Sequence, residues 1–97
     1  MIYKVEFTPQ GLDDISKLDK SVVKRIIQKI EWLTKNLNHI IPQLVKGEFK
    51  GMYKLVIGDW RVLYIADFKK KIITIHILGH RRDIYKKTKH RRGSKFF

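Results

Sequence analysis

The sequence contains no cysteine and few carboxylates, and both shortages narrow the chemistry available to it. Without cysteine there is no disulfide, no thiolate nucleophile and no thiolate ligand for zinc. Nine Asp and Glu residues stand against 22 Lys and Arg residues, which leaves little material for paired acid–base carboxylates. His39 and His90 lack the partner spacing of metal ligands, so we expect neither a metal nor another cofactor.

Long apolar runs are also missing. No stretch approaches the length of a membrane span, and the first seven residues alternate polar with apolar side chains and include Glu6, unlike a secretion signal. The absence of cysteine agrees with a reducing compartment, so we expect a soluble cytoplasmic protein. Ninety-seven residues, 43% of them hydrophobic, suffice for a single domain with one modest core.

Positive charge is what the chain has in excess, and it is unevenly distributed. The formal net charge is +13, and the section from Lys69 to Phe97 supplies +10 of it, with Asp83 as its one acidic residue. A surface of one sign gains affinity for polyanions by releasing their counterions, and such binding weakens with salt. We therefore favour a polyanionic partner over the alternative, a tail that only keeps the protein soluble.

The first part of the chain predicts one strand and two helices. Residues 2–7 alternate with the period of a half-buried strand, and Thr8-Pro9 then provides an N-cap and a first helical position. Ser21 can cap a second helix. The apolar residues at helical spacing are Leu12, Ile15 and Leu18 in the first helix and Val23, Ile26, Ile27, Ile30 and Leu33 in the second. We expect a helical hairpin that covers one face of a sheet.

The second part predicts a connection followed by three strands. Residues 36–51 form the connection, because Pro42 and Gly47 interrupt any regular period. The expected strands are residues 52–57, 60–66 and 71–78. Gly58-Asp59 suits a tight turn between the first two of these strands.

This order of elements predicts the fold class α+β. An N-terminal strand, the helical hairpin and an antiparallel three-stranded meander would form one sheet packed on the helices. We expect one domain over residues 1–85. Residues 86–97 are then a basic tail or a short helix.

Four short segments hold the candidate functional residues. They are Leu44-Val45-Lys46-Gly47, Tyr53-Lys54-Leu55, Gly58-Asp59-Trp60-Arg61-Val62-Leu63-Tyr64 and Gly79-His80-Arg81-Arg82-Asp83-Ile84-Tyr85. They place cations, a histidine and a tyrosine at the ends of predicted strands. A small ribonuclease must activate a ribose 2′-hydroxyl, stabilise charge on phosphorus and protonate the departing 5′-oxygen, and cations with one titratable group can do this without a metal.

Three of these cations have a predicted position. Lys54 alternates with an apolar row, so its amine should project from the opposite face of its strand. Arg61 follows the predicted turn, where a planar guanidinium suits two phosphate oxygens. Arg81 follows Gly79 at the end of the last strand, and Tyr85 comes four residues later.

The order of these segments resembles the RelE/ParE superfamily of small toxins, and the late Gly-His-Arg-Arg-Asp-Ile-Tyr segment resembles its RelE branch, whose members cleave messenger RNA on the ribosome. The resemblance implies that Lys54, Arg61, Arg81 and Tyr85 are catalytic. It also implies a ribosome-dependent endoribonuclease, neutralised by a cognate antitoxin in a toxin–antitoxin hetero-oligomer. Some members carry a second lysine where this chain has Val56, which leaves a decayed toxin as an alternative.

His80 and Tyr85 each have more than one interpretation. His80 either carries a proton, because an imidazole titrates at about pH 6.5, or is a surface histidine at a strand end. Related toxins use a histidine in this region, and His80, Lys46 and Lys50 are candidate substitutes for the missing lysine. Tyr85 either acts as a general base, stacks on a nucleobase, or anchors the C-terminal segment.

The remaining cations are predicted to contact backbone phosphates, which positions RNA without selecting its sequence. These RNA-binding candidates are Lys46, Lys50, Arg82, Lys86, Lys87, Arg91 and Arg92. Two other functions fit the same fold: a ParE-like inhibitor of DNA gyrase, and a non-catalytic RNA-binding module whose basic C-terminal residues make the contacts. The catalytic set favours the nuclease over both.

Overall fold

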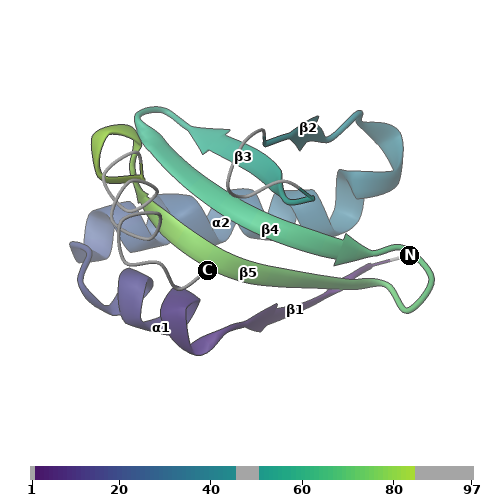
Figure 1. Cartoon of the computed structure of the whole chain (residues 1–97), viewed down its shortest axis with the longest axis horizontal. Coiled ribbons are helices and arrows are strands. Elements are labelled where there is room, and N and C mark those ends of the chain that lie inside the picture. Colours follow the sequence, from purple (N-terminus) through teal and green to yellow (C-terminus); the bar gives the residue numbers. More distant parts are fainter. Residues whose placement is uncertain (1, 46–50, 85–97) are drawn as a thin grey trace.

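The computed structural model describes residues 2–45 and 51–84, which form a mixed α+β structure (Figure 1). In chain order the elements are β1 (Lys4–Phe7), α1 (Pro9–Ser16), α2 (Lys20–Asn36), the 3₁₀ helix η1 (Leu37–His39), β2 (Gln43–Leu44), β3 (Tyr53–Ile57), β4 (Trp60–Asp67) and β5 (Ile72–His80). The strands form one five-stranded sheet in the order β1-β5-β4-β3-β2. β1 runs parallel to β5, and the other neighbouring pairs are antiparallel. The predicted fold class is confirmed.

The start of the domain follows local sequence signals. Thr8 is the N-cap of α1, where its Oγ1 accepts a hydrogen bond from the Gly11 amide at 3.0 Å, and proline occupies the first turn. β1 begins at Lys4 rather than Ile2, because its partner strand begins at Ile72, directly opposite Lys4. The start of β5 therefore determines where β1 begins.

The apolar positions predicted for the first helix, α1, are confirmed in part, because Ile15 and Leu18 pack against the core and Leu12 does not. Leu12 is 55% exposed, and the buried residues of the helix are Gly11 and Asp14. A Cβ atom at Gly11 would lie 2.6 Å from the carbonyl oxygen of Ile75, so only glycine permits this approach of α1 to β5. The prediction that Leu12 is buried is wrong. It considered only the spacing of apolar residues, whereas α1 approaches β5 through a glycine and a carboxylate.

The second helix, α2, buries the stripe that its spacing predicts. Its fully or nearly fully buried apolar residues are Ile26, Ile30 and Leu33. The helix begins at Lys20, because the carbonyl of Asp19 already accepts hydrogen bonds from the amides three and four residues later, each at 3.0 Å. Ser21 therefore lies inside the first turn, and the prediction that it caps the helix is wrong.

The connection between α2 and β3 contains a short strand that was not predicted. Gln43 pairs with Lys54 and Leu44 with Tyr53, so β2 adds a fourth antiparallel strand beside the expected three-stranded meander. Both residues of β2 are exposed. A strand of two exposed residues is held by backbone pairing alone and has no hydrophobic period to reveal it.

The meander itself is confirmed, with one irregularity in its last pair of strands. Gly58 has a φ of +59° in the turn between β3 and β4. Between β4 and β5 the register shifts: Leu63 pairs with Ile77 and Tyr64 with Ile75, which makes His76 the extra residue of a β-bulge. β5 continues to His80, two residues beyond the predicted end, because Trp60 of β4 still pairs with it there.

The sheet carries apolar clusters on both faces. The main core lies between the sheet and the helices and includes Tyr64, Ile73 and Ile75 together with the buried stripe of α2. The second cluster consists of Leu63, Ile77 and Ile84, with Val45 and Met52 packed against it. Within the described residues no helix is long and apolar enough to cross a membrane.

Candidate active site at one end of the sheet

Lys54 and Arg61 lie on the sheet face that points away from the main core. Lys54 pairs with Leu63, a member of the second cluster, and Arg61 pairs with Val56. Because cross-strand partners share a face, Lys54 and Arg61 are diagonal neighbours, for which Cβ atoms are typically about 7–8 Å apart. Both residues are half-buried. The pairing of β3 with β4 therefore brings together two cations that are seven positions apart in the sequence.

The guanidinium of Arg61 is tied to the turn that precedes it. Its Nη1 donates to the carbonyl oxygens of Gly58 at 2.8 Å and Trp60 at 3.0 Å. On the other side, Arg61 pairs with Gly79, which is buried and carries no side chain. The local turn thus orients the guanidinium.

Arg81 reaches the same turn from the end of β5. Its amide donates to the carbonyl oxygen of Asp59 at 2.8 Å, and its Nε lies 3.7 Å from Oδ1 of the same residue. The two side chains of this ion pair are 58% and 62% exposed, and such surface pairs contribute only about 0–1 kcal/mol. The backbone of Arg81 is therefore fixed, whereas its guanidinium can exchange Asp59 for a phosphate at little cost.

His80 is oriented by its neighbours on both sides. Its Nδ1 accepts a hydrogen bond from the Arg82 amide at 3.2 Å, which places the proton of a neutral imidazole on Nε2. Its ring contacts Trp60 edge to face, with centroids 5.3 Å apart and planes at 80°. The sequence did not reveal Trp60 as the support of His80, since only the pairing of β4 with β5 makes them neighbours.

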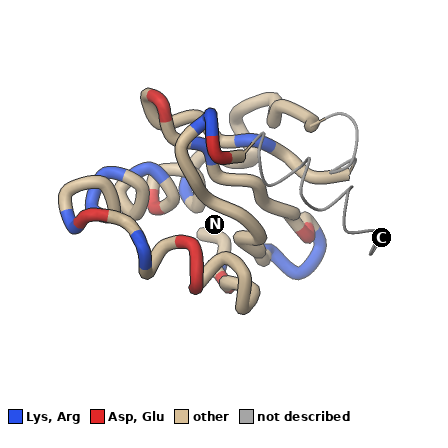
Figure 2. The backbone as a smooth tube through the Cα atoms, turned by 60° about the vertical axis from the view of Figure 1, so that its left-hand side comes forward, with Lys and Arg blue, Asp and Glu red and all other residues tan. Residues whose placement is uncertain are grey.

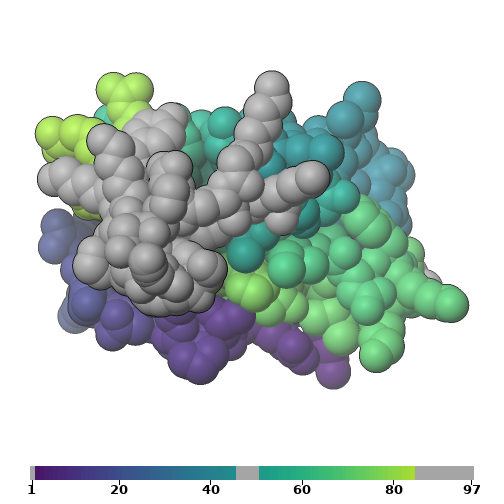
Figure 3. All heavy atoms as spheres, in the orientation of Figure 1, coloured from purple at the N-terminus to yellow at the C-terminus, as the bar shows by residue number. Residues whose placement is uncertain are grey.

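Three of the predicted site residues, Arg61, His80 and Arg81, thus lie at the turn between β3 and β4, and Lys54 lies diagonal to Arg61, further along β3. His80 shares the face of Trp60, which packs against the main core, whereas Lys54 and Arg61 lie on the other face. Figure 1 shows residues 81–84, the yellow-green segment, beside that turn, and Figure 3 shows the same segment at the surface. Arg82 belongs to this helical segment and is exposed.

The other predicted site residues lie outside the described part of the chain. They are Lys46, Lys50, Tyr85, Lys86, Lys87, Arg91 and Arg92. The predicted basic tail or short helix over residues 86–97 also lies outside it. In the described segments, no three His, Asp or Glu side chains are grouped in a way that would hold a metal ion.

An apolar pocket adjoins the site on the side of α2. Its volume is about 190 Å³, and it is bordered by Lys54 and Val56 of β3 and by Trp32 of α2. Trp32 is 39% exposed and Val56 41% exposed, and Ile41 at the same pocket is 93% exposed. Lys29 lines the pocket too, with its amine 3.9 Å from the centroid of Trp32. The surface next to the candidate site is therefore apolar with a cationic border.

Comparison with known proteins identifies the family. The family model described as "ParE toxin of type II toxin-antitoxin system, parDE" matches residues 5–85. The chain belongs to the RelE/ParE superfamily of type II toxins. No curated protein sequence matches this toxin.

Solved structures of the superfamily share the fold of this toxin. A RelBE toxin–antitoxin complex from Mycobacterium tuberculosis matches with a TM-score of 0.73 at 21% identity, covering 82% of this chain and 92% of that one. The archaeal RelE–RelB complex from Pyrococcus horikoshii matches with a TM-score of 0.65 at 26% identity, covering 84% and 97%. The isolated RelE toxin of E. coli matches with a TM-score of 0.68 at 18% identity, covering 92% and 97%.

Proposed function

We propose that this toxin is a metal-independent endoribonuclease that cleaves messenger RNA on the ribosome. The observation that carries the proposal is the placement of Arg61 and Arg81 at one turn, with Lys54 diagonal to Arg61 on the same face of the sheet. Three separate segments supply these cations, and a phosphodiester in cleavage needs positive charge from several sides. The structural likeness to RelE toxins supports the same assignment at the level of the fold.

The proposed chemistry is attack by a ribose 2′-hydroxyl on the adjacent phosphorus. The hydroxyl loses its proton to a base, for which Tyr85 is the candidate, while the phosphorus–5′-oxygen bond breaks and a 2′,3′-cyclic phosphate forms. Arg61 and Arg81 are suited to the non-bridging oxygens, because each guanidinium presents two parallel N–H donors. Lys54 adds charge stabilisation, and His80 is the candidate general acid: it must first be protonated to imidazolium, which ends the hydrogen bond of its Nδ1 with the Arg82 amide, before its Nε2 proton can pass to the departing 5′-oxygen.

The test removes equal charge from two ends of the molecule. The double variant Arg61→Ala/Arg81→Ala is compared with Lys69→Ala/Lys70→Ala, in a reconstituted translation system with primer extension to map the cuts. We expect the arginine variant to lose at least about 100-fold in cleavage rate, because each lost donor to a developing oxyanion typically costs about that factor. The lysine variant should cut like the unmodified toxin. Equal activity of the two variants would remove the proposed active site.

The proposed protein partner is a cognate antitoxin of acidic, partly apolar composition. The exposed Trp32, Ile41 and Val56 offer apolar contacts, and Lys29 and Lys54 at the same pocket attract carboxylates. The solved complexes of related toxins with antitoxins support this assignment. Co-expression with the product of an adjacent reading frame, followed by copurification of wild type and Trp32→Glu/Val56→Glu, tests it. Undiminished capture by the double variant would exclude this surface.

A second function is favoured by the description of the matching family, which is that of ParE toxins. Under this alternative the toxin inhibits DNA gyrase and cuts no RNA. A gyrase supercoiling assay beside the cleavage assay separates the two, since a gyrase inhibitor blocks supercoiling with ribosome-bound messenger RNA left intact.

A further inference from the structure

Where β1 ends, helix α1 replaces it as the neighbour of β5. β1 pairs with β5 only as far as Phe7, which lies opposite Ile75. Beyond it, the amide of Thr8 donates to the carbonyl oxygen of Ile75 at 3.0 Å, and its hydroxyl donates to that of His76 at 3.3 Å. The close approach at Gly11 continues this contact. From the bulge onward, β5 is therefore bordered by a helix rather than by a strand.

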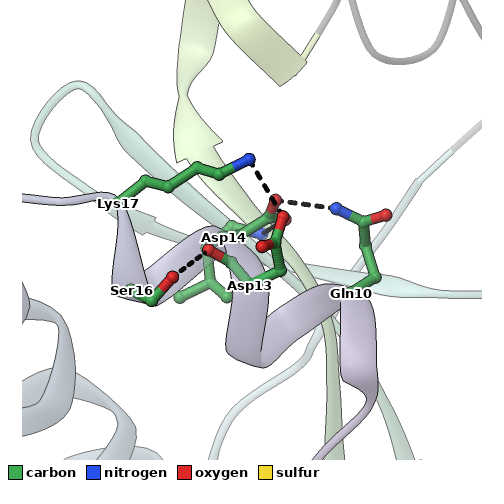
Figure 4. A network of polar contacts seen from close by, with 6 residues as sticks. Gln10, Asp13, Asp14, Ser16 and Lys17 are labelled. Atoms are coloured by element: carbon green, nitrogen blue, oxygen red, sulfur yellow. Dashed lines mark hydrogen bonds and ion pairs between the residues drawn. The ribbon is translucent and has the colours of Figure 1, made fainter.

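The carboxylate of Asp14 makes the most buried of these contacts. Its side chain is 5% exposed, and its Oδ2 accepts a hydrogen bond from the Leu78 amide at 3.0 Å. Its Oδ1 accepts from Nε2 of Gln10 at 2.8 Å, so both oxygens have a described donor (Figure 4). Hydrogen bonds to an ionised acceptor in a buried place are stronger than neutral ones. Asp14 thus ties α1 to one particular peptide group of β5.

That peptide group lies between the β-bulge and the candidate active site. His76 is the extra residue of the bulge, and an extra residue shifts every later residue of its strand relative to the partner. The amide of Leu78 is the first described contact between α1 and β5 after the shift. Directly beyond it, Gly79 pairs with Arg61 and His80 pairs with Trp60.

We propose that Asp14 is a positioning residue for the active site: it locks β5 after the bulge, so that Gly79, His80 and Arg81 lie in register with Arg61. Asp14 touches no part of the substrate and acts through the backbone of Leu78. This inference rests on the proposed nuclease function for its consequence in catalysis, but its structural part concerns the free toxin alone.

The structural part is tested by backbone NMR and amide hydrogen exchange on the free toxin. Asp14→Ala removes the acceptor, Asp14→Asn keeps an oxygen at the same place, and Asp13→Ala is the matched control. Asp13 neighbours Asp14 on α1, but its carboxylate is exposed and, among the described residues, forms an ion pair with Lys17 at 3.0 Å. In Asp14→Ala we expect the Leu78 amide to exchange at least about tenfold faster, with shifted signals for residues 79–81. Asp14→Asn and Asp13→Ala should leave both close to wild type.

The catalytic part is tested by the rate of messenger RNA cleavage at saturating and subsaturating toxin concentrations. We expect Asp14→Ala to lower the maximal rate by about 10- to 100-fold with the half-saturating concentration changed less than about twofold, because a small misplacement of catalytic groups costs rate rather than binding. Asp14→Asn should recover most of the rate. Ile26→Val, a core change in α2 that leaves the hydrogen bond between Asp14 and the Leu78 amide in place, is the control for a general loss of stability.

Each outcome bears on one part of the proposal. An unchanged Leu78 amide and unchanged signals for residues 79–81 in Asp14→Ala would overturn the positioning role, whatever the toxin's activity. A loss of rate that Ile26→Val shares at equal melting temperature would overturn it as well. If wild-type toxin cuts no RNA while Asp14→Ala still shifts residues 79–81, then the nuclease assignment fails and the structural role of Asp14 stands.

Discussion

The two ends of the hairpin formed by β4 and β5 are both rich in cations, yet they are built differently. At one end Lys69, Lys70 and Lys71 follow one another along a single turn, the continuous blue stretch of Figure 2. At the other end Arg61 and Arg81 come from different segments and bind the same turn, Arg61 at the carbonyl oxygens of Gly58 and Trp60 and Arg81 at Asp59. Lys54 lies diagonal to Arg61 on β3. The three lysines are neighbours along the chain and need no tertiary contact to lie close together, whereas groups on paired strands are brought together by the pairing. A count of charges does not separate these ends, but the pairing of strands does.

The turns at the two ends also differ in how they are held. Asp67 closes the lysine turn with its own side chain, whose Oδ1 accepts from the amides of Lys69 at 3.0 Å and Lys70 at 2.9 Å. The turn at Gly58-Asp59 is held by contacts from outside it, through the guanidinium of Arg61 and the amide of Arg81. The lysine turn is thus held by a side chain of its own, whereas the turn at Gly58-Asp59 is held by two residues of the candidate site.

The largest expected difference between the two ends is in the cleavage rate when one cation is replaced by another of the same charge. Arg81→Lys keeps the charge but loses the planar fork, so we expect cleavage of ribosome-bound messenger RNA to fall by about tenfold or more. Lys70→Arg at the other end should leave the rate unchanged. Primer extension over a time course measures both variants, and an equally active Arg81→Lys toxin would show that charge alone suffices at that position.

A smaller difference, in the free energy of unfolding, is expected when the described residue with positive φ at each end is substituted. Gly58 and Lys71 both have a φ of +59°. Gly58→Ala should lower the free energy of unfolding by about 1 kcal/mol, because a Cβ is strained in this region and would lie 2.9 Å from Nη2 of Arg25. Lys71→Gly should raise it by at most about 0.5 kcal/mol, since relief of strain is offset by a more flexible unfolded chain. Urea unfolding measures both, and a stabilising Gly58→Ala would contradict the strained turn.

The smallest expected effect is a change in stability at high pH that Tyr64 causes and that is absent at neutral pH. Tyr64 lies in the middle of β4, away from both ends. Burial raises the pKa of its phenol to about 12. Because the unfolded value is about 10, the unfolded chain releases this proton first, so the stability is complete below pH 10 and is lost as pH rises toward 12. The urea midpoint of wild type should fall across that window, and Tyr64→Phe should flatten the fall. An equal slope in the variant would assign it to other groups.

Much of the fold could be predicted because its signals are local. The alternation of residues 2–7, the Thr8-Pro9 start of α1, the buried stripe of α2 and the Gly58-Asp59 turn each depend on neighbours a few positions away. Three features escaped prediction because their cause is distant. β2 forms only by pairing with β3, Leu12 is exposed because α1 packs through Gly11, and the role of Asp14 depends on an amide 64 positions away.

The candidate site, like the fold, was predictable from the sequence only in part. Its residue types, their places at strand ends and the excess of positive charge are properties of the amino-acid order, because side-chain chemistry and strand period are carried by the chain itself. Which cations meet was decided by the register of three strands and by a bulge at His76, and these depend on how distant segments pack. The amino-acid sequence specifies which chemical groups the protein has, but only long-range pairing places Lys54 diagonal to Arg61 and brings Arg61 and Arg81 to the same turn.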